Sequence, residues 1–109
     1  MSGRPPFSEP SVARRLGALE AAFRRALRCG GEPSQRALAD LTRRAAELTR
    51  AAGSAPPDQA PACLAALRRI RRLHDQLALR VALERQEAAD GLAHLRTGKK
   101  TLKAYRDAP

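Results

Sequence analysis

Residues 58–97 read DQAPACLAALRRIRRLHDQLALRVALERQEAADGLAHLRT, and this stretch decides the fold. Its apolar stripe recurs at spacings of three, four or seven residues: Leu64, Leu67, Ile70, His74, Leu77, Val81, Ala88, Leu92 and Leu95. Leu73 and Leu83 widen this stripe. That spacing is one face of an α helix. Asp58 is expected to cap the helix and Pro61 fits its first turn, whereas Gly98 is expected to end it. At about 1.5 Å per residue, a helix over residues 59–97 spans about 60 Å.

Two shorter helices are predicted ahead of it, over about residues 9–29 and 33–52. Ser8 is expected to cap the first, with Pro10 in the first turn, and Gly30 with Gly31 is expected to end it. The second has the narrow apolar seam of a coiled coil. The apolar positions are Val12, Leu16, Leu19, Phe23 and Leu27 in the first helix, and Leu38, Leu41, Ala45, Leu48 and Ala52 in the second.

These elements predict an all-α fold, because the chain has no strand pattern. At 109 residues it is one domain at most. The connections are short, the longer one being a Gly- and Pro-rich linker at residues 53–57, so neighbouring helices should be antiparallel. We therefore expect an antiparallel three-helix bundle over residues 1–97, with one long C-terminal helix, followed by a short basic tail at residues 98–109.

The chain carries a net charge of +10. Two interpretations are open: a surface that binds phosphates or acidic proteins, or an arginine excess that reflects genome composition. The densest basic cluster is Arg68, Arg69, Arg71 and Arg72, and a second is Lys99, Lys100 and Lys103. On a helix, Arg68 and Arg72 share one side while Arg69 points elsewhere. The cluster has no interleaved aromatic residues of the kind that bind single-stranded nucleic acid.

No pattern of residues indicates an enzyme. His74 and His94 are twenty residues apart without companion ligands, and Cys29 and Cys63 lack metal-binding spacing. No nucleophile or nucleotide-binding motif is present. Acidic residues after position 83 alternate with arginines and are interpreted as a solvated helix face; they are Glu84, Glu87 and Asp90, beside Arg80 and Arg85. We therefore expect no enzymatic activity, no cofactor and no metal.

The N-terminus is polar and Pro-rich, unlike a signal peptide. No apolar run approaches the ~20 residues that a membrane-spanning helix needs. A cytoplasmic protein without membrane insertion is the expectation.

The last part of the chain is its least generic: Leu92-Ala93-His94-Leu95-Arg96-Thr97-Gly98-Lys99-Lys100-Thr101-Leu102-Lys103-Ala104-Tyr105-Arg106. Leu102 and Tyr105 are three residues apart, so a short helix would place both on one side. One interpretation is a frayed basic terminus. The other is a docking peptide with two apolar anchors and a cationic rim, which binds as a helix in a groove.

This ending resembles the close of bacterial flagellar export chaperones of the FlgN and FliT type. The resemblance implies a small, all-helical, cytoplasmic protein that binds the helical C-terminus of a late export substrate. Such substrates are filament-cap or hook-filament junction proteins. The chaperone keeps them unpolymerised and delivers them to the type III export gate.

The resemblance also implies two binding sites. The apolar stripe of the third helix would receive the substrate helix, through Leu64, Leu67, Ile70, Leu73, Leu77, Val81, Leu92 and Leu95. Leu102 and Tyr105 would dock on the cytoplasmic domain of the export gate.

Two other functions stay open. One is a small basic nucleic-acid-binding protein that uses the two basic clusters. The other is a self-associating coiled-coil adaptor, in which the stripe pairs with a second copy. Whether the chain is a monomer or a homodimer also stays open.

Overall fold

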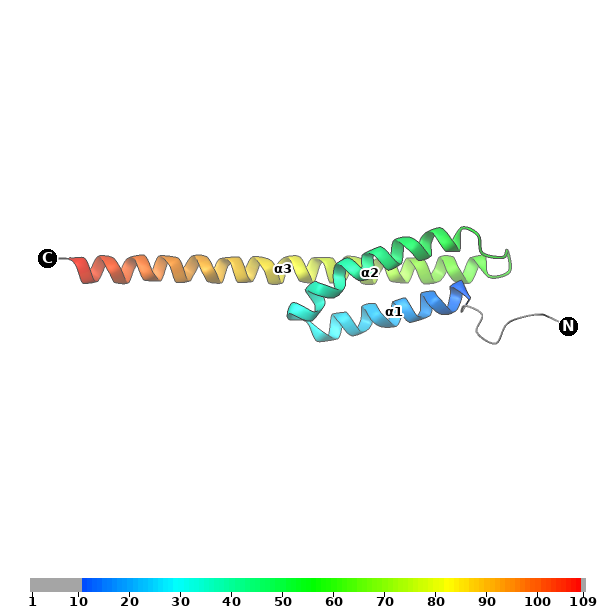
Figure 1. Ribbon diagram of the computed structural model, residues 1–109, viewed down its shortest axis with the longest axis horizontal. Coiled ribbons are helices and arrows are strands. Elements are labelled where there is room, and N and C mark those ends of the chain that lie inside the picture. The colour runs from blue at the N-terminus through cyan, green and yellow to red at the C-terminus, as the bar shows by residue number, and fades with distance from the viewer. Residues whose placement is uncertain (1–10, 109) are drawn as a thin grey trace.

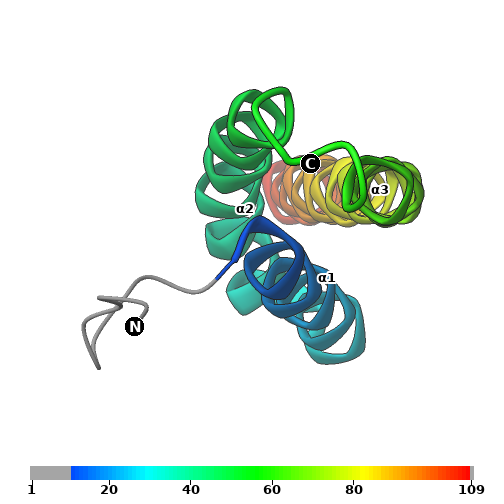
Figure 2. The ribbon, with the colours of Figure 1, turned by 90° about the vertical axis from the view of Figure 1, so that its right-hand side faces the viewer.

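The computed structural model describes residues 11–108, which form three α helices (Figure 1). They are α1 (Val12–Cys29), α2 (Gly31–Ala52) and α3 (Ala60–Asp107). α1 and α2 form a hairpin along the first half of α3, and α2 runs antiparallel to both other helices (Figure 1). Viewed end-on, the three helices lie at the corners of a triangle (Figure 2). The predicted all-α three-helix bundle is confirmed.

α1 begins at a serine cap. The Ser11 hydroxyl oxygen accepts a hydrogen bond from the Arg14 amide at 3.3 Å, which satisfies one of the free donors of the first turn. The expected cap at Ser8 and first-turn position of Pro10 lie outside the described residues. The apolar face points into the bundle through Leu16, Leu19, Phe23 and Ala26.

The connection between α1 and α2 is a very tight glycine turn. Gly30 and Gly31 have φ of 65° and 64°, the left-handed region that glycine enters without steric cost. A Cβ on Gly30 would lie 2.5 Å from the Arg80 guanidinium of α3. The backbone conformation therefore favours glycine at position 30, where a Cβ would also displace the end of the Arg80 side chain. The predicted end of the first helix is confirmed.

α2 presents a narrow face to the core, as its seam predicts. Leu41 and Leu48 are buried, and the fully buried Ser34 hydroxyl donates a hydrogen bond to the Ala26 carbonyl of α1. This hydrogen bond satisfies a polar group that would otherwise be costly to bury. The helix begins two residues earlier than predicted and ends at Ala52 as predicted.

α3 supplies half of the core. Gln59, and not Asp58 as predicted, is its N-cap, and no side chain bonds there; Pro61 does lie in the first turn. Because the buried positions repeat every three or four residues, they form one stripe facing α1 and α2. The buried residues of α3 are Cys63, Ala66, Ile70, Leu73, Leu77 and Val81.

The predicted end of this helix at residue 97 is wrong. α3 continues through Gly98 to Asp107, and Gly98 keeps a negative φ. Glycine inside a helix costs only about 1 kcal/mol relative to alanine, and the residues that follow are mostly good helix formers. The segment predicted as a tail is therefore the last part of a helix that is about 70 Å long.

We expect Leu77→Ala to destabilise the bundle strongly and Leu95→Ala to leave it nearly unchanged. Leu77 is fully buried, whereas Leu95 is 64% exposed. A buried Leu→Ala change costs about 2–5 kcal/mol, and exposed changes stay within about 0.5 kcal/mol. Urea unfolding followed by circular dichroism measures both. Similar costs for the two variants would contradict this core.

The same Gly→Ala change should act in opposite directions at two glycines. At Gly98, where an added Cβ would meet no other atom within 4 Å, it should stabilise the end of α3 by about 1 kcal/mol. At Gly30, it should destabilise the bundle, because alanine is strained at φ 65° and meets Arg80. Amide hydrogen exchange of residues 94–102 checks the first expectation, and urea unfolding checks the second. Slower exchange should accompany Gly98→Ala.

Candidate functional site

The eight residues of the predicted substrate groove do not share one open surface. Four of them, Ile70, Leu73, Leu77 and Val81, are buried against α1 and α2, and Leu67 is half-buried. Leu64, Leu92 and Leu95 are exposed. The chain's own hairpin therefore occupies the middle of the stripe, so the structure leaves only its two ends uncovered.

The largest uncovered part is the second half of α3. Residues 85–107, here called the arm, are all exposed and extend beyond the glycine turn of the hairpin (Figure 1). The arm is about 35 Å long, and it makes the molecule elongated, with principal extents of 92 × 26 × 20 Å.

The arm has an apolar face without a partner in this structure. Leu92, Leu95, Leu102 and Tyr105 are 56%, 64%, 63% and 82% exposed. Their spacings of three and seven residues place them along one side of the helix. Leu102 and Tyr105 therefore share one side, as their spacing predicts.

The charge on this part of the arm has one sign. Residues 92–106 carry cations and no carboxylate. By helical spacing, Lys99 and Arg106 lie between the angular positions of Leu92 and Leu95, and Lys103 lies just beyond Leu92. The five cations are Arg96, Lys99, Lys100, Lys103 and Arg106. An apolar stripe with interleaved cations is suited to a partner surface that combines an apolar groove with carboxylates.

A polar contact fixes the base of the arm. Glu84 Oε1 accepts hydrogen bonds from the Gly31 amide at 3.1 Å and from Arg80 Nε at 3.3 Å. The Arg80 guanidinium also donates to the Leu27 carbonyl at the end of α1. The Gly31 amide is the main cause of a Glu84 pKa below its ordinary value, with Arg80 adding to it. Glu84 and Arg80 thus join α3 to the glycine turn, so interpreting them as a solvated face was wrong.

The first basic cluster divides between two sides of α3. Arg69 Nε donates to Glu20 Oε1 of α1 at 2.8 Å, and this contact is the leading cause of a lowered Glu20 pKa. Arg68, Arg71 and Arg72 face a groove between α2 and α3 instead. The predicted separation of Arg69 from Arg68 and Arg72 is confirmed. About 40 Å of helix separates this cluster from the lysines of the arm.

The groove between α2 and α3 is open to solvent and has a volume of about 680 Å³. Its floor is apolar, its α3 side carries the guanidinium groups, and its α2 side carries two threonines. Its lining residues are Thr42, Ala45, Ala46, Thr49, Leu67, Arg68, Ile70, Arg71, Arg72, His74 and Asp75. The sequence pattern singled out Ala45, Leu67, Ile70 and the arginines on separate helices. It did not predict the groove, because periodicity does not show how the two helices are aligned.

His74 has a structural role at the edge of this groove. Its ring nitrogens lie 3.2 Å from Thr42 Oγ1 and 3.2 Å from Asp75 Oδ1, and its ring contacts Phe23 edge-on. Within residues 11–108, no three His, Cys, Asp or Glu side chains gather to hold a metal ion. Cys29 is exposed and Cys63 is buried.

Comparisons of the chain with models of protein families, with curated proteins and with solved structures find no match. In the part of the chain that the structure describes, no helix combines the length and the apolar character needed to cross a lipid bilayer.

Glu84→Gln should weaken the bundle at neutral pH and flatten its loss of stability in acid. The folded-state pKa of Glu84 lies below its ordinary value of 4.5, so the ionised carboxylate contributes its full stabilisation of the bundle at pH values above 4.5. This contribution is lost as the pH falls through the lowered folded-state pKa. Urea midpoints between pH 7 and pH 3 measure the effect. Glu87→Gln on the exposed arm is the matched control, and equal effects of the two variants would contradict the contact with the glycine turn.

Proposed function

We propose that this chain is a non-enzymatic export chaperone of the flagellar FlgN and FliT type. It would act in the cytoplasm, bind the helical C-terminus of a filament-cap or hook-filament junction protein, and deliver it to the export gate. The observation that carries the proposal is the arm, a long helical segment that no other part of the described chain covers. The resemblance of residues 92–106 supplies the identity of the partners.

The shape of the arm supports a role in binding proteins. A helix that projects from a bundle is accessible on every side, so a partner can dock without displacing the hairpin. Leu92, Leu95, Leu102 and Tyr105 provide apolar anchors at helical spacing. Tyrosine is frequent among the residues that dominate binding energy, and Tyr105 is 82% exposed.

The arm is long enough for two partners. Leu92 and Leu95 would receive the substrate helix, and Leu102 and Tyr105 would dock on the export gate. About 15–20 Å of helix spans the two pairs. The substrate site proposed here is shorter than the stripe expected from the sequence, because Ile70, Leu73, Leu77 and Val81 lie in the core.

Tyr105→Ala should weaken binding to the soluble domain of the export gate about tenfold or more, while binding to the substrate stays within about twofold. Truncation of a tyrosine that dominates binding costs about 2 kcal/mol or more, and about 1.4 kcal/mol already corresponds to tenfold. Isothermal titration calorimetry with purified gate domain and filament-cap or hook-associated subunits measures both affinities. Leu79→Ala, at a 62% exposed leucine of the bundle, is the control.

Three outcomes would contradict the proposal. Equal loss of both affinities would contradict two separate sites, and binding of neither protein would contradict the chaperone function. Binding of nucleic acid by the intact chain, with affinity falling steeply as salt rises, would favour the nucleic-acid-binding alternative.

A further inference from the structure

We infer that the groove between α2 and α3 binds an acidic amphipathic helix of a partner protein, which packs as a fourth helix of the bundle. This site lies on the bundle and shares no residue with the arm. It therefore does not depend on the chaperone proposal.

The floor of the groove has the shape that helix packing requires. Ala45 and Ala46 of α2 are small, and with the half-buried Leu67 and the buried Ile70 of α3 they form an apolar surface. Small side chains let helix axes approach to about 8–10 Å. The lining runs from Thr42 to Thr49 on α2 and from Leu67 to Asp75 on α3, which is about two turns on each helix.

The α3 side of the groove has an excess of positive charge. Arg71 pairs with Asp75 at 3.9 Å, whereas Arg68 and Arg72 make no ion pair with any residue among 11–108. Arg68 and Arg72 are one helical turn apart and both line the groove. Carboxylates spaced one turn apart on a docked helix would pair with both.

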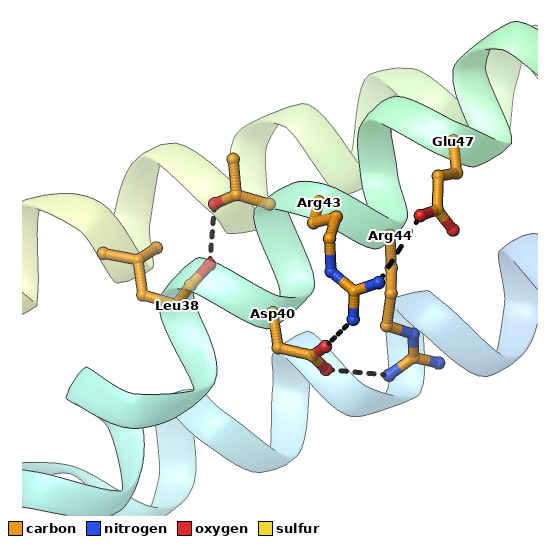
Figure 3. Close-up of polar contacts among 6 residues, drawn as sticks. Leu38, Asp40, Arg43, Arg44 and Glu47 are labelled. Carbon is orange, nitrogen blue, oxygen red and sulfur yellow. Dashed lines mark hydrogen bonds and ion pairs between the residues drawn. The ribbon is translucent and has the colours of Figure 1, made fainter.

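Arg43 and Arg44 of α2 do not offer an unpaired positive charge to a docked helix. Figure 3 shows Arg43 joined to Asp40 and to Glu47, and Arg44 joined to Asp40. These cations already have carboxylate partners on their own helix. The charge that lacks a partner is thus on one side of the groove only. The docked helix should accordingly carry its acidic residues along the flank that faces α3.

Other occupants fit this surface less well. A second copy of the chain would bring a net charge of +10 towards the same arginines. A nucleic acid would leave the alanine floor unused, and no aromatic residue lines the groove for a base to stack on. An acidic amphipathic helix uses both the apolar floor and the guanidinium groups.

The test uses the full chain and two designed helical peptides. Both carry alanine and leucine at i, i+3, i+4 and i+7; one has glutamates along one flank and the other has glutamines. Fluorescence anisotropy should show that the glutamate peptide binds at least about tenfold more tightly and that its affinity falls with salt. Amide shifts on adding it should centre on residues 42–49 and 67–75.

Arg68→Gln with Arg72→Gln should weaken binding of the glutamate peptide about tenfold. The control variant, Arg25→Gln with Arg28→Gln, removes the same charge from α1. It should change the affinity for the glutamate peptide by less than about threefold. Ala46→Trp, at an exposed position of the floor, should block the groove, and circular dichroism verifies that each variant folds.

Several results would overturn the inference. The glutamate peptide could fail to bind at about 1 mM, the range of a very weak interface, or the two peptides could bind equally. The two pairs of arginine substitutions could weaken binding equally, or the amide shifts could be confined to the arm. Tighter binding of a single-stranded oligonucleotide, lost on mutating Arg68 and Arg72, would assign the groove to nucleic acid instead.

Discussion

The contact between the glycine turn and the Arg80–Glu84 pair sets the geometry of the whole molecule. Glu84 bonds the Gly31 amide and Arg80 bonds the Leu27 carbonyl, so the hairpin meets α3 at a defined position. Before that position, α1, α2 and the first half of α3 enclose a shared core. Everything after it is a helix without tertiary contacts in the described structure. The boundary between bundle and arm therefore follows from one turn whose positive φ angles favour glycine.

The positive charge of the chain is distributed in a way that follows from this geometry. Arg69 and Glu20 join α3 to α1, and the charges of α2 pair mostly along their own helix. Besides Arg14, Arg15, Arg25, Arg28 and Arg50, the cations without a carboxylate partner in the described chain lie at two places, the α2–α3 groove and the arm. Each of these places combines them with apolar side chains. This pairing of charge with apolar surface, and not the net charge alone, separates candidate binding surfaces from solvated ones.

Helical periodicity predicted the core well and the surfaces poorly. The stripe from Leu16 to Phe23 and the seam at Leu41 and Leu48 turn inward as their spacing requires. Periodicity shows which side of a helix is apolar, but it does not show where the covering helices stop. The middle of the groove expected along α3 therefore lies in the core, and its C-terminal end lies exposed on the arm. Likewise, the contact of Glu84 with Gly31 depends on how the helices are aligned, which no local pattern encodes. The end of α3 was missed for a related reason: Gly98 could end a helix or continue it at a small cost, and the helix formers beyond it favour continuation.

The uncovered arm also divides the chain into two parts that resist proteolysis differently. A helix held only by its own hydrogen bonds opens with a free energy near zero, whereas the core opens only when the bundle unfolds. The arm contains six Lys or Arg residues, so a trypsin-like protease would cut there first. A partner bound along the arm would protect those bonds. The rate at which a protease cleaves the intact chain would then measure what fraction of the molecules has a partner bound to the arm.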